Sequence, residues 1–130
     1  MKKAWLILII VIVLIILGVM IFRPGGEDSW IKDERGVWIK HGYPANTPDH
    51  VIEQQAVISG ALELYGQEKL EGMGFSSQCL GVVGEYAVDV VHVPRSDEDN
   101  LVENQCEAYR SGEVSHFIEL DKDGVVVRVV

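Results

Sequence analysis

Cys79 and Cys106 are the two thiols available for chemistry in this chain of 130 residues. An even number of cysteines in a small domain outside the cytoplasm is typical of a disulfide. A bridge between them would close a loop of 28 residues, counted from 79 to 106, and contribute about 3.5 kcal/mol to stability. Two unpaired buried thiols are the alternative. Because no Cys-x-x-Cys spacing occurs, the pair does not indicate a redox or zinc motif.

His92 and His116 fall on the apolar faces of two expected strands, the first beside Val88 and Val90 and the second beside Ile118. Imidazoles on neighbouring strands can bind a metal ion together with a carboxylate. However, no spacing enforces such a site and no third ligand stands out, and a histidine on an apolar face is more often a core or rim residue. His92 and His116 are therefore weak candidates for metal ligands, and we expect no cofactor.

Two acidic segments carry oxygen ligands of the kind that calcium prefers. Residues 97–100 read Asp-Glu-Asp-Asn, and residues 121–124 read Asp-Lys-Asp-Gly, which matches only part of a calcium-binding loop. Capping of a helix explains the first segment and a tight turn explains the second. Calcium binding is therefore a secondary hypothesis.

Catalytic motifs do not stand out in the sequence. It has no Gly-x-Ser-x-Gly nucleophile elbow, Gly-rich phosphate loop or dinucleotide-binding fingerprint. The sequence therefore identifies no catalytic residue and does not favour an enzyme. The alternative in this class is a metal-dependent or hydrolytic enzyme that uses His92, His116 and nearby acids.

Aromatic residues gather in one short segment, at Trp30, Trp38, His41 and Tyr43. If their rings are exposed, they form a candidate recognition patch. The alternative is that they are core residues or an interfacial belt close to a bilayer, and we expect at least one of the two tryptophans to be core.

The elements that position these residues begin with an apolar run. From Ala4 to Phe22 there are 19 residues without a charge, enough for about 28 Å of helix against a hydrocarbon core of about 30 Å. The run is longer than the apolar part of a cleaved signal peptide, and no small-residue pair marks a cleavage site. We expect a retained transmembrane helix that contacts the lipid bilayer through residues 4–22.

Basic residues indicate the orientation of this helix. Lys2 and Lys3 precede it and Arg23 follows it, so the positive-inside rule places the N-terminus inside and the C-terminal domain outside the cell membrane. We therefore expect an anchor at 1–22, a short linker at 23–28 and an extracytoplasmic domain at 29–130.

The charge of the domain restricts its partners. Residues 24–130 contain all 20 acidic residues and eight of the 11 basic ones, which gives a net charge of −12. This charge excludes nucleic acid and disfavours anionic lipid headgroups. A protein partner at the cell surface is compatible with it, and the oligomeric state is not predicted.

Alternating apolar and polar residues predict three hairpins, at 30–41, 78–93 and 117–128. The first and third share their turn residues, because Asp33 and Gly36 match Asp121 and Gly124. A short helix at 97–110 is expected to have Ser96 as its N-cap and to bring four side chains inward, those of Leu101, Val102, Cys106 and Tyr109.

The main helix is expected to have Thr47 as its N-cap and Pro48 as its first residue, and to end near Gly66 or Gly72. A broad apolar stripe is expected to face a sheet, with Val51, Ile58, Leu62 and Tyr65 flanked by Val57, Ala61 and Leu64. The polar face carries Glu53, Gln54 and Glu63. On this assignment, Leu62→Glu unfolds the domain, and Gly60 marks close packing.

These elements predict an α+β fold, in which an N-terminal transmembrane helix precedes a small domain with an antiparallel sheet and one main helix packed across it. The order of helix and hairpins is also similar to that of PepSY and cystatin-like domains, an analogy at the level of fold.

The segment from Trp30 to Pro44, with Gly36-Val37-Trp38-Ile39-Lys40-His41-Gly42 at its centre, resembles a segment that follows the anchor in uncharacterised prokaryotic envelope proteins. It covers about 15 residues, and Tyr43 stands where those proteins are expected to have Asn or a similar residue. The resemblance implies a prokaryotic cell-surface setting and assigns no site residue.

Together, these features predict a membrane-anchored extracytoplasmic binding or interaction domain that is not an enzyme. A second alternative to the envelope enzyme is a pilin-like structural subunit, which also joins an apolar helix to a β-rich head. The sequence lacks the early acidic residue and the processing site of such subunits.

Overall fold

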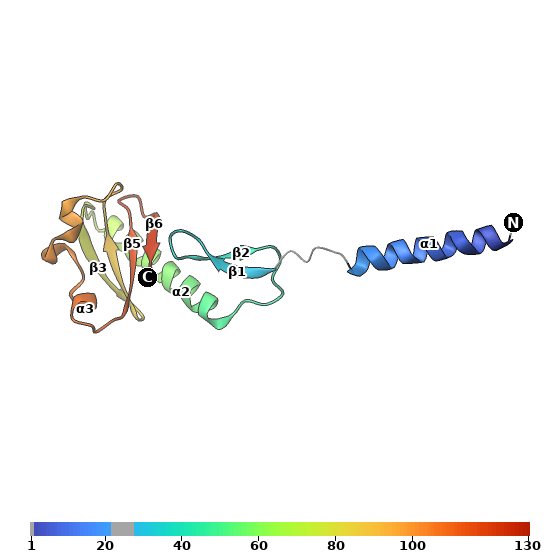
Figure 1. Cartoon of the computed structure of the whole chain (residues 1–130). Coiled ribbons are helices and arrows are strands. Elements are labelled where there is room, and N and C mark those ends of the chain that lie inside the picture. Colours follow the sequence, from blue (N-terminus) through green and yellow to red (C-terminus); the bar gives the residue numbers. More distant parts are fainter. Residues whose placement is uncertain (1, 22–27) are drawn as a thin grey trace.

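The computed structural model describes residues 2–21 and 28–130 (Figure 1). In chain order, its elements are α1 (Lys2–Ile21), β1 (Ser29–Lys32), β2 (Trp38–His41), α2 (Asp49–Leu70), β3 (Gln78–Val83), β4 (Tyr86–Val90), the 3-10 helices η1 (Asp97–Asn100) and η2 (Val102–Asn104), α3 (Glu107–Arg110), β5 (His116–Leu120) and β6 (Val126–Val129). This mixture of helices and sheets confirms the α+β class.

The helix α1 carries apolar side chains that remain exposed: the Trp5 side chain is 71% exposed, and every residue from Ile7 to Leu17 is exposed. Across residues 2–21 and 28–130, the structure contains no helix that combines the length and the apolarity needed to cross a membrane. Phe22 and most of the expected linker lie outside the described residues. The membrane anchor therefore stays a prediction.

The first hairpin forms where the sequence predicts it, but β1 and β2 make a two-stranded sheet of their own. Its turn and the turn of the last hairpin have the same hydrogen bonds. In each, Oδ1 of the first aspartate, Asp33 or Asp121, accepts the backbone N–H groups two and four residues further on, at 2.8 to 3.0 Å. Gly36 and Gly124 close the turns with φ of 82° and 81°. The shared residues thus encode the same turn, which accounts for the acidic segment 121–124 without a metal.

The main helix begins one residue later than predicted. Pro48, with an extended ψ of 152°, is the N-cap instead of Thr47, because its carbonyl oxygen accepts the first helical N–H groups at 3.0 and 3.1 Å. The helix ends at Leu70, and Gly72, with φ of 84°, follows it. The longer of the two predicted ends is therefore correct.

The second sheet has four strands in the order β3-β4-β5-β6. Its two hairpins are antiparallel as predicted, but β4 and β5 are parallel, with Tyr86 opposite His116 and Val90 opposite Leu120. The prediction of an antiparallel sheet is wrong at this pairing. The connection of residues 91–115 is long enough to return the chain to the same end of the sheet, which parallel pairing requires.

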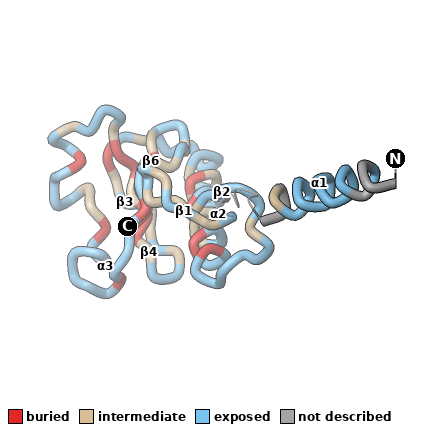
Figure 2. Tube along the Cα trace, turned by 45° about the vertical axis from the view of Figure 1, so that its right-hand side comes forward, coloured by how far each residue is buried: buried red, intermediate tan, exposed pale blue. Residues whose placement is uncertain are grey.

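The helix α2 covers one face of this sheet, and buried residues concentrate between the two elements (Figure 2). The core combines Ala61 and Tyr65 of α2 with Val88, Ile118 and Leu120 of the sheet. A smaller cluster on the opposite face consists of Ala87, Cys106, Val114 and Phe117. The sheet thus separates a large apolar core from a small one.

The predicted apolar stripe of α2 is confirmed except at Leu62, since Val51, Ala61 and Tyr65 are buried and the remaining predicted residues pack against the core. Leu62, which we expected to be essential, is 40% exposed, whereas Gln54, which we assigned to the polar face, is buried. The Gln54 amide faces the first hairpin: it accepts the Trp38 N–H at 2.8 Å and donates to the Gly36 carbonyl at 2.9 Å. The prediction failed because a buried glutamine that satisfies backbone groups has the same sequence signature as a surface glutamine.

Close packing at Gly60 is confirmed. A Cβ atom added there would lie 2.7 Å from Cγ1 of Val83, which is shorter than Cβ contacts allow. Only a glycine therefore lets α2 approach β3 this closely.

The predicted short helix at 97–110 is wrong. The segment consists of η1, η2 and the single turn α3, and Leu101, Val102 and Tyr109 are exposed, although Cys106 is buried as expected. Ser96 is the N-cap of the first turn, as predicted. The helix is interrupted at Leu101 and Gln105, where the backbone is extended with ψ of 135° and 146°, and the backbone N–H of Cys106 is donated to a sheet side chain, Asp89, at 3.1 Å.

Candidate binding site

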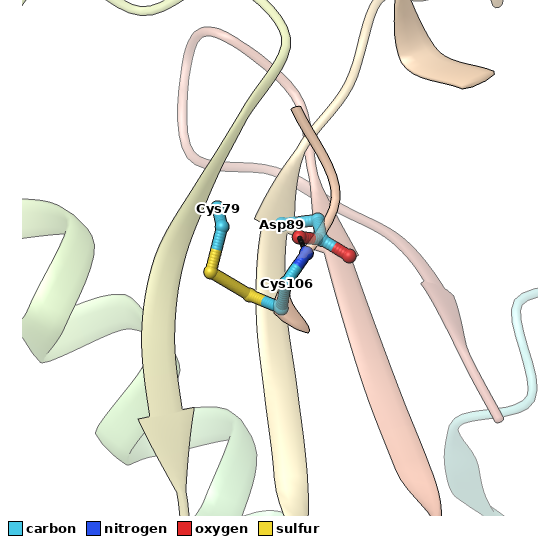
Figure 3. A group of neighbouring side chains, drawn as sticks. All are labelled: Cys79, Asp89 and Cys106. Carbon is cyan, nitrogen blue, oxygen red and sulfur yellow. Dashed lines mark hydrogen bonds between the residues drawn. A yellow bond between two sulfur atoms is a disulfide. The ribbon is translucent and has the colours of Figure 1, made fainter. Parts of the chain in front are cut away.

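Cys79 of β3 and Cys106 form a disulfide on the sheet face opposite α2, which confirms the predicted bridge (Figure 3). Cys106 is fully buried and Cys79 is exposed. The bridge fixes the connection of residues 91–115 to the sheet. This connection forms the wall of the site described below.

A row of polar side chains crosses the sheet beside the disulfide. In the strand register, Cys79 lies opposite Asp89, Asp89 opposite Glu119, and Glu119 opposite Arg128. Directly opposed residues share one face of a sheet, and neighbouring strands are about 4.8 Å apart. Two carboxylates are therefore neighbours on this face.

A cavity of about 130 Å³ lies over this row. Its charged and polar lining includes Ser77, Asp89, Arg95, Asp99, Glu119 and Arg128, and the rings of Tyr109 and Phe117 contribute an apolar side. Both signs of charge are therefore present within one small cavity.

The Asp99 carboxylate in this cavity is fully engaged. Its Oδ1 accepts the His92 N–H at 3.1 Å and lies 3.0 Å from His92 Nδ1, and its Oδ2 accepts the Ser96 N–H at 2.7 Å. Burial alone would raise the pKa of Asp99, but these hydrogen bonds outweigh it and lower the pKa to about 2. Asp99 therefore acts as an ionised structural anchor for the loop.

The Asp89 carboxylate is in a different state. Its Oδ1 accepts only the Cys106 N–H (Figure 3), and among the described residues no Lys, Arg or His nitrogen lies within 4.0 Å of it. Burial raises the pKa of Asp89 to about 6, opposed by that hydrogen bond and reinforced by the charge of Glu119. At neutral pH, Asp89 is thus an ionised carboxylate without a direct ion-pair partner, and Arg95 acts on it only through its nearby charge.

The two arginines of the cavity also differ. Arg95 forms an ion pair with the buried Glu119, with Nη1 to Oε1 at 2.6 Å, so each neutralises the other. The Arg128 guanidinium lies over the Phe117 ring, 4.9 Å from its centroid, and makes no ion pair with a carboxylate of the described residues. The cavity therefore contains one unpaired anion, Asp89, and one unpaired cation, Arg128.

Apart from Asp99, which belongs to the acidic segment 97–100 and completes the capping box with Ser96, sequence reasoning did not identify the charged residues of this cavity. A signal for three of them is nevertheless present, since Asp89, Glu119 and Arg128 are each flanked on both sides by aliphatic residues within a predicted strand. A charged residue in an apolar strand can line a polar site. Three strands with one such residue each indicate that the charged residues gather on one face of a sheet. Arg95 lies in a loop and gives no comparable signal.

The two histidines proposed as weak metal ligands are not brought together. His116 lies beside Tyr86 at one end of the β4–β5 pair, with ring centroids 4.8 Å apart, whereas His92 lies beyond Val90 at the other end. The arrangement in which they face each other on neighbouring strands, considered as a weak possibility, does not occur, because β4 ends at Val90 and leaves His92 in the loop.

Potential metal ligands gather elsewhere. In the described part of the chain, the group of three or more Cys, His, Asp and Glu side chains close enough to share an ion is Cys79, Asp89 and Cys106, with ligand atoms within 4.8 Å of one another. Both sulfurs belong to the disulfide, so they are not available as thiolate ligands. This group does not have the chemistry of a metal site while the bridge is intact.

The candidate recognition patch is divided. The Trp30 indole donates to the Asn46 carbonyl at 3.0 Å, and the Trp38 ring lies 4.8 Å from that of His50. Both tryptophans are half-buried, so neither is the core residue that we expected, whereas His41 and Tyr43 are exposed. In the register of the hairpin, Trp30 is opposite Lys40 and Trp38 is opposite Lys32, so the two tryptophans share one face and His41 is on the other.

In comparisons with known proteins, no family model, no curated protein and no solved structure matches this chain. Its function is therefore argued from its own side chains.

Proposed function

We propose that this chain is a membrane-anchored extracytoplasmic binding domain, and that its ligand occupies the cavity beside the disulfide. The observation that carries this proposal is the coexistence of Asp89 and Arg128 in that cavity, each with a full charge and without an ion-pair partner. Asp89 is half-buried and Arg128 is exposed, so a cationic ligand group would recover the desolvation cost of the Asp89 charge, while Arg128 offers an accessible guanidinium to an anionic group.

Several observations support an anchored setting. The 19 uncharged residues from Ala4 to Phe22 are long enough for the hydrocarbon core, and the described side chains from Ile7 to Leu17 are exposed apolar groups. The disulfide between Cys79 and Cys106 agrees with an oxidising compartment outside the cytoplasm. These features favour the orientation in which Lys2 and Lys3 remain inside.

A labelling experiment tests this topology. In a Cys79→Ser/Cys106→Ser background, Glu63→Cys places one thiol on the exposed face of α2, and Ala4→Cys, which keeps both lysines, is the control at the start of the anchor. In intact cells, a membrane-impermeant maleimide should label the first variant and spare the second. Labelling of the Glu63→Cys variant only after lysis would contradict an extracytoplasmic domain.

A separate experiment tests the cavity. Backbone amide signals of the full chain in detergent micelles are recorded with probes of four kinds: small amines, small carboxylates, zwitterionic amino acids and neutral polar molecules. We expect at least one kind to shift the amides of Ser77, Asp89 and Glu119 in a saturable way. If no kind does so, the cavity is not a binding site.

A further inference from the structure

We infer that the cavity binds a small zwitterion of the amino acid type, whose ammonium group pairs with Asp89 and whose carboxylate pairs with Arg128. This inference rests on the proposed binding function and specifies the chemistry of its ligand. It follows from which charges of the cavity are already neutralised, from the volume that remains, and from the apolar groups beside it.

Five charged groups line the cavity, and two of them neutralise each other. The pair of Arg95 and Glu119, at 2.6 Å, occupies the middle of the row. Asp99 is not available, because hydrogen bonds from His92 and Ser96 saturate its carboxylate. What remains is one carboxylate and one guanidinium.

These two unpaired groups are on different strands of one face. Asp89 is in β4 and Arg128 is in β6, with Glu119 of β5 between them in the register. A ligand that bridges β4 and β6 therefore needs a cationic donor at one end and an anionic acceptor at the other. A planar guanidinium suits a carboxylate because it can donate two parallel hydrogen bonds to it.

The size of the cavity limits the ligand. Its volume is about 130 Å³, and it is partly open to solvent. This suits the charged end groups of a small amino acid. The Tyr109 and Phe117 rings offer contacts for a few methylene or methyl groups.

Binding of an ammonium group should also release a proton. The pKa of Asp89 is raised to about 6 by burial and by the nearby charge of Glu119, and Arg95 partly opposes the shift. The other charged groups that face the cavity are Asp99, which remains ionised, and Arg128. A bound cation stabilises the ionised form of Asp89, so near pH 6 part of the population must lose a proton on binding.

The test compares zwitterions with their halves by calorimetry on the full chain in micelles. Glycine, alanine, β-alanine and 4-aminobutyrate are the zwitterions, and ethylamine and acetate carry one charge each. We expect the best zwitterion to bind at least about tenfold more tightly than either half, and to release protons at pH 6 but fewer at pH 8. The order of the four affinities reports the distance between the Asp89 carboxylate and the Arg128 guanidinium, because the zwitterions differ in the spacing of their own charges.

Charge-removing variants identify the two contacts. Asp89→Asn should abolish the proton release and the preference for zwitterions over acetate, and Arg128→Gln should abolish the preference over ethylamine. The controls are Glu63→Gln on α2 and Lys122→Gln in the turn between β5 and β6, which should leave binding unchanged. Far-ultraviolet circular dichroism confirms that each variant is folded.

Three results would overturn the inference. In the first, ethylamine or acetate binds as tightly as every zwitterion. The cavity would then still be a binding site, but its ligand would belong to a different chemical class. In the second, zwitterions bind but the two charge-removing variants retain their affinity. In the third, zwitterions do not bind at all, and the amide signals of the cavity then show whether the binding function itself fails or only the assignment of its ligand.

Discussion

The two faces of the four-stranded sheet use the same strands for different purposes. On the α2 face, Val88 and Ile118 pack against Ala61 and Tyr65 in an apolar core. On the opposite face, the adjacent strand positions hold Asp89 and Glu119, whose like charges lie side by side. Like charges at opposed positions destabilise a sheet. The comparison teaches that burial of apolar side chains on the first face stabilises the domain. This stabilisation offsets the free-energy cost of the charged groups on the second face.

The largest effect should come from the core of the α2 face. Ile118 is fully buried, and Ile118→Ala removes apolar contacts and leaves a cavity, which typically costs about 2–5 kcal/mol. Val125→Ala, in the same hairpin but at an exposed position, is the matched control and should cost much less. Chemical denaturation measures both values, and equal losses would refute the assignment of the core.

A slightly smaller effect is expected from the covalent link on the opposite face. Cys79→Ser should lower the free energy of unfolding by about 3.5 kcal/mol, because the bridge closes the loop of residues 79–106. Cys106→Ser should cost at least as much, since its side chain is buried. Reduction of the wild-type protein should reproduce the loss, and unchanged melting temperatures in both variants would mean that no bridge forms.

A stabilising effect is expected from removal of the unpaired charge. The folded-state pKa of Asp89 is raised from 3.8 to about 6, so its contribution to stability is present below pH 4 and is lost as the pH rises through about 6. Asp89→Asn retains an acceptor for Cys106 N–H and removes the charge. At pH 7 it should raise the free energy of unfolding by about 1–2 kcal/mol, after allowance for partial solvent screening.

The pH dependence separates this explanation from a general effect of the substitution. The difference between Asp89→Asn and the wild type should grow between pH 4 and pH 7 and remain constant above that range. Asp99 has the opposite sign, since its lowered pKa makes it stabilising above pH 4, and its titration near pH 2 lies outside this window. A difference that does not change with pH would count against an ionised, unpaired Asp89.

The smallest effect should come from Leu62. The sequence predicts that Leu62→Glu unfolds the domain, but the side chain is 40% exposed on α2, so we now expect a loss of less than about 1 kcal/mol. A matched comparison is Ala61→Glu, which places a charge at a fully buried neighbouring position and should prevent folding. If both variants unfold, the orientation of α2 is wrong.

Local patterns predicted local structure well. The hairpin turns, the second end of α2 and the disulfide followed from residue types at short spacing, such as Asp33 with Gly36. The pairing of β4 with β5 did not, because alternation in a strand does not reveal which neighbour it joins or in which direction. Parallel pairing depends on the path of residues 91–115, which contains no long periodic element.

The site was harder to predict than the fold. Its residues come from β4, β5, β6 and the connecting loop, so they converge only once the sheet order is known. Gln54 illustrates the same limit in the fold, because its role depends on the backbone of a hairpin 18 residues away, at Gly36. His92 and His116 were considered as metal ligands because of their residue type. Their positions at opposite ends of the β4–β5 pair could not be deduced from the sequence.

The parallel junction between β4 and β5 has a consequence for the order of folding. Each hairpin joins residues that are close in the chain, whereas this junction requires the ordering of all of residues 91–115 first. Formation of contacts between residues distant in sequence costs more conformational entropy, because a longer loop must be closed. We therefore expect the hairpins to form early and the junction late. The cavity spans that junction, and a molecule bound there would therefore interact with the finished domain and not with its precursors.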